Sequence, residues 1–232
     1  ITATTWVIEN TVNTDDFIFQ TLSNSSISLS GEFNLNQYGS NGDLCNLTIG
    51  GTSSLSADAI ELNLANDASI NTENSVILDV LGGSITTANN ITANMTSMYN
   101  FEFDISNDGT VTIGNDLVLN KDGGNNAIVT LGASGGTNNL LTVNGNIDLD
   151  TRDDATGIME IELNAASVVD LEGDVLFKTT LPNQLLIDIN ATADFQIAGE
   201  FNRAINGSQY GSLFSENTAS VTYNGTVIQQ ME

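Results

Sequence analysis

Two pairs of carboxylates have a spacing that general acid–base chemistry could use. Glu102 and Asp104 are two residues apart, as are Glu160 and Glu162. On a strand this spacing places both side chains of a pair on one face, roughly 6.6–7 Å apart, which suits the two acids of a glycosidase. The apolar residues between them, such as Phe103, take the inward positions, so we interpret these acids as a solvated outer face.

The residues that would complete such a site are scarce. The sequence has no histidine, which excludes His-dependent triads and two-His metal sites. Its four basic residues, Lys121, Arg152, Lys178 and Arg203, lie far apart in the sequence, whereas β-helical lyases commonly need a basic residue near bound calcium. We therefore predict that the chain is not an enzyme. A polysaccharide lyase or hydrolase that depends on Arg152 or Arg203 is kept as an alternative.

An acidic segment gives a candidate ion site. Asp148, Asp150, Asp153 and Asp154 place four carboxylates within a short stretch that we expect to form a turn. Oxygen ligands of this kind suit calcium, although aspartate is also an ordinary turn residue. These four residues are the predicted calcium ligands, and no other cofactor is expected.

Four aromatic residues could stack on sugar rings. Trp6, Tyr38, Tyr99 and Tyr210 combine a flat apolar face with a polar atom. They support an alternative function, a glycan-binding module on a β-helical scaffold.

A repeated motif organises the chain around these residues. In residues 169–177, VDLEGDVLF, apolar residues alternate on both sides of a glycine that an acidic residue follows. Similar stretches recur every 26 to 32 residues, a period typical of solenoids. Their central positions are Gly31, Ala57, Asn89, Asn115, Gly145, Gly173, Gly199 and Gly225.

Most of these motifs follow a second alternating segment about ten residues upstream, for example residues 101–105, 159–163 and 185–189. Such alternation predicts strands with one apolar face. One unit cannot bury that face alone, whereas stacked units form a continuous core. The sequence therefore predicts an all-β fold, a parallel β-solenoid of about eight coils. Residues 1–24 are expected to form strands that lead into a repeat region at 25–232. Tandem β-sandwiches remain the alternative.

Local features of the repeats give further expectations. The glycine or asparagine at each centre suits a corner that needs either positive φ or a close backbone approach. The alternation slips by one residue after Ala57, which a β-bulge would absorb. Residues 132–136 are expected to be an inserted turn. Outward asparagine and threonine rows are expected to form hydrogen-bonded ladders between coils.

Charge and composition exclude several partners. The net charge is −25, from 29 acidic and four basic residues, and such a surface repels phosphate backbones and anionic lipids. We therefore expect no nucleic-acid binding. No apolar run approaches the roughly 18 residues of a membrane span, so no membrane insertion is expected. The single cysteine, Cys45, is interpreted as a core residue. The sequence begins at Ile1 and we recognise no signal peptide in it, so we expect a processed protein or a segment of a longer one.

Three short stretches resemble a known class of surface protein. Residues 219–230 (ASVTYNGTVIQQ), 46–51 (NLTIGG) and 141–145 (LTVNG) are similar to phrases of large repetitive proteins. Bacteria of the Bacteroidetes type export those proteins through the type IX secretion system. Autotransporter passengers and filamentous-haemagglutinin-like β-helices share the same rhythm and are a rival match.

The resemblance implies a secreted, cell-surface adhesin or filament segment with a structural role. Open solenoid ends must be capped or paired, so we expect self-association into a homo-oligomer or filament, or contact with adjoining repeats of the same chain. Glycans and other cell surfaces are further candidate partners.

Overall fold

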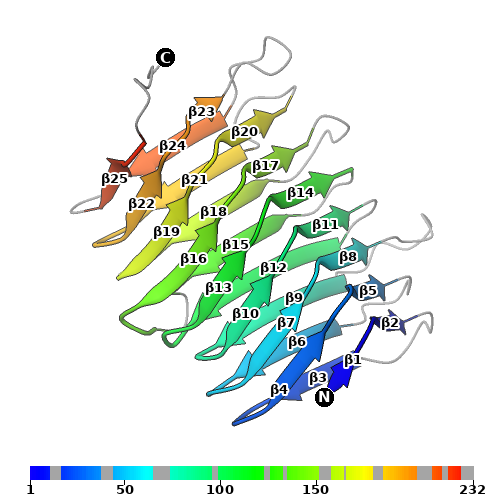
Figure 1. The fold of residues 1–232 in the computed structure, drawn as a ribbon. Helices are drawn as coiled ribbons and strands as arrows, with labels where there is room; N and C mark the ends of the chain where they lie inside the picture. The colour runs from blue at the N-terminus through cyan, green and yellow to red at the C-terminus, as the bar shows by residue number, and fades with distance from the viewer. Residues whose placement is uncertain are drawn as a thin grey trace.

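The computed structural model describes residues 1–10, 17–37, 44–64, 74–95, 99–122, 126–132, 135–151, 158–164, 166–179, 185–202, 211–215 and 219–225. Within these ranges the chain consists of strands and turns and contains no helix. The strands stack from the first coil at the bottom of Figure 1 to the last at the top, and they form three sheets.

Within the described residues, the three sheets contain nine, eight and eight strands. Sheet A consists of β1 (Thr2–Ala3), β4 (Ser26–Leu29), β7 (Ser54–Ala57), β10 (Ser84–Thr87), β13 (Thr110–Ile113), β16 (Asn139–Val143), β19 (Ser167–Leu171), β22 (Asp194–Ile197) and β25 (Ser220–Tyr223). Sheet B consists of β2 (Trp6–Asn10), β5 (Phe33–Gln37), β8 (Ile60–Leu64), β11 (Ile91–Met95), β14 (Leu117–Lys121), β17 (Ile147–Asp150), β20 (Val175–Lys178) and β23 (Phe201–Asn202). Sheet C consists of β3 (Phe17–Thr21), β6 (Leu44–Gly50), β9 (Asn74–Leu81), β12 (Tyr99–Ser106), β15 (Ala127–Leu131), β18 (Met159–Leu163), β21 (Leu185–Ile189) and β24 (Gly211–Ser215).

Each coil contributes one strand to each sheet in the order A, B, C, and each strand pairs with its equivalent in the next coil. All of the paired strands run parallel, as in β12 with β9 and β15. This pairing confirms the parallel β-solenoid and excludes β-sandwiches, whose strands are antiparallel. Strands β1, β2 and β3 join the same three sheets, so the N-terminal segment is itself part of the solenoid.

Alternation places the core inside the three sheets. In β12, Phe101, Phe103 and Ile105 are fully buried, while the residues between them are only half-buried on the outside. The same pattern in successive strands produces one continuous hydrophobic cluster along the axis. Cys45 lies in this cluster as a buried thiol, as expected, and burial raises its pKa to about 12.

The nine-residue motif spans two strands and the corner between them. In residues 169–177, β19 ends at Leu171 and β20 begins at Val175, so the central Gly173 lies in a three-residue corner. A corner of three residues preserves the alternation, because inward positions stay an even number apart. The motif therefore has the pattern of a single strand, although it turns from sheet A to sheet B.

The glycines at this corner are required by close contact between coils and not by positive φ. None of the eight central positions is among the residues with positive φ. A Cβ on Gly173 would lie 2.3 Å from the carbonyl oxygen of Gly145, and one on Gly199 would lie 2.3 Å from that of Gly173. Of the two explanations given by the sequence, close backbone approach is the correct one.

Two irregularities of the repeat are differences in corner length. The slip after Ala57 is not a bulge: only Asp58 and Ala59 separate β7 from β8, one residue fewer than in the neighbouring corners. In contrast, seven residues separate β15 from β16, which confirms the inserted turn. Within that turn Gly132 and Gly136 have φ of 83° and 100°, which glycine adopts without strain.

Candidate functional site

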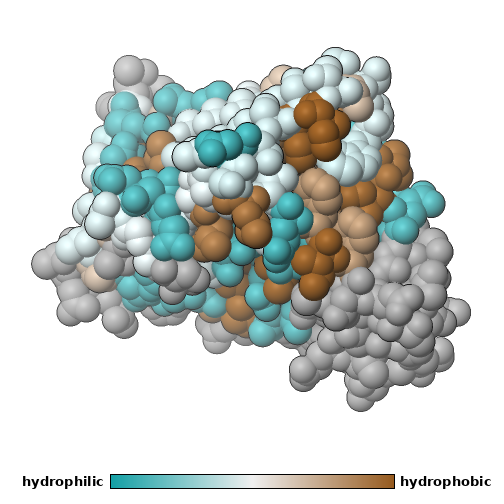
Figure 2. All heavy atoms as spheres, turned by 90° about the horizontal axis from the view of Figure 1, so that it is seen from below, coloured by the Kyte–Doolittle hydropathy of each residue, from teal (hydrophilic) through white to brown (hydrophobic). Residues whose placement is uncertain are grey.

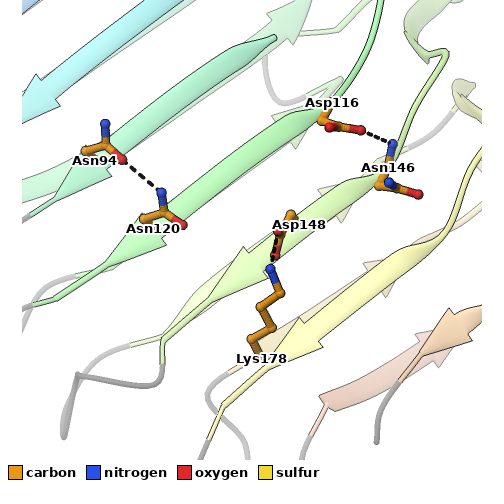
Figure 3. Close-up of polar contacts among 6 residues, drawn as sticks. All are labelled: Asn94, Asp116, Asn120, Asn146, Asp148 and Lys178. Carbon is orange, nitrogen blue, oxygen red and sulfur yellow. Dashed lines mark hydrogen bonds and ion pairs between the residues drawn. The ribbon is translucent and has the colours of Figure 1, made fainter. Parts of the chain in front are cut away.

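A row of asparagines runs along the outer face of sheet B. The amide of Asn63 donates to the side-chain oxygen of Asn36 at 3.1 Å, Asn94 donates to Asn63 at 3.0 Å, and Asn120 donates to Asn94 at 2.9 Å. Figure 3 shows the last of these contacts. Each inner amide both donates and accepts, so the row connects four consecutive coils. The expected asparagine ladder is confirmed for these residues.

A second ladder explains the acidic or amide residue that follows the central position. The side-chain oxygen of Asn90 accepts a hydrogen bond from the backbone N–H of Asp116 at 3.0 Å. The Asp116 carboxylate accepts one from the backbone N–H of Asn146 at 2.6 Å (Figure 3). Asn146 continues the row by accepting a hydrogen bond from the backbone N–H of Asp174. The Asp174 carboxylate in turn accepts one from the backbone N–H of Glu200 at 2.8 Å. These side chains satisfy corner N–H groups that the sheets leave unpaired, which is a structural role.

The paired carboxylates lie on the outer face of sheet C, as expected, but they are only partly solvated. Pairing in register places Asp104 beside Asp79 of the preceding coil and Glu162 beside Asp188 of the following one. Burial, and then the charges of Glu102 and Asp79, raise the pKa of Asp104 from 3.8 to about 6. This crowding could not be predicted from the sequence, because the neighbouring acids come from different coils.

Similar crowding affects the second pair. Burial, and then the charges of Glu162 and Asp188, raise the pKa of Glu160. Strand β15 lies between the two carboxylate pairs and carries no charge on its outer face, where its residues are Ile128 and Thr130. A hydrogen bond from Thr130 lowers the pKa of Asp104 and so opposes part of the increase.

Asp104 makes stability depend on pH. Because its pKa is raised on folding, the folded chain favours the protonated acid, and this stability is complete below about pH 4 and lost as pH rises through 6. We expect Asp104→Asn to raise the free energy of unfolding at pH 7.5 by about 1 kcal/mol, after allowing for solvent screening, and to flatten its dependence between pH 4 and 7. Chemical denaturation at several pH values measures both.

The exposed corner residue Glu172 provides the control for that experiment. Its Glu172→Gln variant removes the same charge away from sheet C and should leave the pH profile unchanged. Equal effects of the two substitutions would mean that overall charge, and not the contacts of Asp104, determines the profile.

The four predicted calcium ligands are not seen together in the described chain. Asp148 and Asp150 lie in strand β17 and not in a turn, while Asp153 and Asp154 fall outside the described residues. Lys178 donates to Asp148, so this carboxylate already has a cationic partner (Figure 3). Within the described ranges, no group of three or more Cys, Asp or Glu side chains is placed to hold a metal ion.

The predicted sugar-stacking residues are mostly outside the described structure. Trp6 is half-buried in the first coil and makes edge-to-face contacts with Phe19 and Phe33, at centroid distances of 5.0 and 5.9 Å. Its ring therefore extends the core. Tyr38, Tyr210 and the side chain of Tyr99 lie outside the described residues.

The basic residues considered for catalysis are likewise dispersed. Lys121 is buried at the end of β14, and burial lowers its pKa to about 8. Lys178 makes its ion pair on the outside of β20. Arg152 and Arg203 fall outside the described residues.

Sequence reasoning missed a shallow hollow of about 340 Å³ at the corner between sheets A and B. It lies where this corner is one residue shorter, and its lining includes Glu32, Asp58, Glu61 and Asn90. The slip in the alternation after Ala57 was the signal for it, because a shorter corner leaves space between its longer neighbours.

No protein-family model, curated protein or solved structure matches this chain. In the described part of the chain, no helix has the length and apolarity needed to cross a membrane. The fold and the ladders define the chain as a parallel β-solenoid with side-chain hydrogen bonds between its coils.

Proposed function

We propose that the chain is a structural segment of an extracellular filament or adhesin stalk, in which about eight coils form one rod that continues by stacking at its ends. The role needs no catalysis. The resemblance of short motifs to phrases of type IX-exported surface proteins supports a bacterial cell-surface location. The main support comes from the two ends of the solenoid.

Exposed apolar side chains concentrate at these ends. In the described chain, the large hydrophobic residues that are exposed are Ile1, Val7, Ile18, Leu22 and Tyr223. The first four belong to the first coil and the fifth to the last strand of sheet A. Figure 2 views the end formed by the first coil and shows apolar (brown) side chains among polar ones. A further coil stacked there would remove part of this surface from water.

Open strand edges coincide with the apolar ends. Among the described residues, strands β1, β2 and β3 each pair with a strand on one side only, as do β25, β23 and β24 at the other end. The backbone groups of the first edge that point away from the second coil can pair with a further parallel strand. Stacking of one copy on the next is a head-to-tail contact, which produces a filament when it does not close.

A proline substitution in β2 tests the proposal. The backbone N–H of Trp6 donates to Glu32 in the second coil. Because successive N–H groups of a strand point in opposite directions, that of Val7 faces the open edge. Val7→Pro removes this free donor and leaves the bonds to β5 intact. We expect the wild type to associate as concentration rises and Val7→Pro to remain monomeric in sedimentation experiments and electron micrographs.

Val7→Thr is the matched control, since it removes the exposed apolar side chain but keeps the N–H group. It should associate nearly as well as the wild type if strand pairing drives assembly. A wild type that stays monomeric at high concentration would refute end-to-end stacking.

A further inference from the structure

The outer face of sheet A carries a regular array of hydroxyl groups. Two columns of serine and threonine run along consecutive strands, one through the four strands from β4 to β13 and the other through the five strands from β4 to β16, with each residue in register with its neighbours. One column is Ser26, Ser54, Ser84 and Thr110, and the other is Ser28, Ser56, Thr86, Thr112 and Thr142. All nine side chains are exposed or half-buried. The array is therefore accessible to a ligand.

This hydroxyl face is free of charge in a chain of net charge −25. The outward positions of β4, β7, β10 and β13 are all serine or threonine. In contrast, the outer faces of sheets B and C carry carboxylates such as Glu61, Asp148 and Glu102. Asp170 in β19 marks where the uncharged face ends. This face offers hydrogen bonds but no ion pairs, which favours a neutral polar ligand.

The repeat of the array restricts the ligand further. Hydroxyls recur about every 4.8 Å between coils and about every 6.7 Å within a strand. The five strands cover roughly 200–300 Å² at these spacings, well below the roughly 800 Å² per partner of a stable protein interface. The described outward positions of these strands include no aromatic ring on which a sugar could stack. A protein partner and a soluble glycan therefore fit poorly.

We propose that the hydroxyl face of sheet A binds ice. Oxygen atoms on the flat faces of an ice crystal repeat on the same scale as the array in both directions. Hydroxyl groups held on a rigid sheet can order the water molecules bound to them with the same spacing. Ordered water then bridges two surfaces at little enthalpic cost. The methyl groups of Thr86, Thr112 and Thr142 limit how many other orientations that water can adopt. This function is separate from stacking at the solenoid ends.

The test is thermal hysteresis and inhibition of ice recrystallisation by the purified chain. The wild type should separate the melting and freezing temperatures of ice in a concentration-dependent way and shape the growing crystals. Thr86→Tyr, in the middle of the array, should abolish both effects because a large ring holds the ice surface away from the neighbouring hydroxyls. Thr112→Tyr should do the same.

Thr92→Tyr is the matched control, since Thr92 is an outward threonine of β11 in sheet B. It should keep full activity, and thermal melting should show that all three variants are folded. Absence of thermal hysteresis in the wild type would overturn the proposal, as would equal loss in the sheet A and sheet B variants. Binding to crystalline polysaccharide without any effect on ice would assign the face to another ligand and would also overturn it.

Discussion

Replacing Phe103 by alanine is expected to destabilise the solenoid by about 3–5 kcal/mol. Phe103 is fully buried in β12, between Leu78 of the preceding coil and Val129 of the next. Removal of the ring leaves a cavity that sheets held by parallel pairing on both sides cannot collapse to fill. This is the largest effect we expect from one substitution.

The position of the loss can be measured as well as its size. Because each coil contacts only its neighbours, the damage should be local. Hydrogen exchange should show the greatest loss of protection in β9, β12 and β15, and a smaller loss in β19 and β22. Ile128→Ala is the control, because Ile128 is a half-buried outward residue of β15, and it should cost about 1 kcal/mol or less. Equal loss of protection along the whole chain would contradict a coil-by-coil structure.

Gly173→Ala is expected to cost about 2–3 kcal/mol. The added Cβ would lie 2.3 Å from the carbonyl oxygen of Gly145 and 2.7 Å from its carbonyl carbon, so the two coils must separate locally. Such a shift also strains the hydrogen bond that the backbone N–H of Gly199 donates to the Gly173 carbonyl oxygen, which is 3.1 Å long in the wild type. Denaturant unfolding of the variant measures the loss directly.

Asn115 provides the control, because it occupies the equivalent corner and already has a Cβ. Asn115→Ala loses only the amide bond to Asn90, at 2.9 Å, which should cost about 1 kcal/mol or less at this exposed position. If Gly173→Ala cost no more than this control, close packing of the corner backbone would not be the reason for glycine.

The sequence alone determined the strands, their inward faces and the stacking of repeats. Apolar residues at every second position of a strand all lie on the same face, so only that face can point into the core. Residues such as Leu171, Val175 and Ile161 are fully buried, as this pattern predicts. The recurring glycines also located the corners between sheets A and B. These features are local, so each stretch of sequence contains the information by itself.

The number of strands per coil could not be read from the sequence. A three-residue corner keeps inward positions an even number apart, so Leu171 and Val175 have the spacing of a single strand although they lie in different sheets. Only the pairing of β19 with its neighbours in sheet A, and of β20 in sheet B, separates them.

The contacts that distinguish this solenoid were decided by the tertiary structure. Asp104 lies beside Asp79, Lys178 reaches Asp148, and the hydroxyls of sheet A align because coils of unequal length return to the same register. The connections between successive strands vary from two to nine residues, so sequence separation alone does not give the partner of an outward residue. Alternation specifies that a side chain points outward, and the stacking of coils specifies its neighbours.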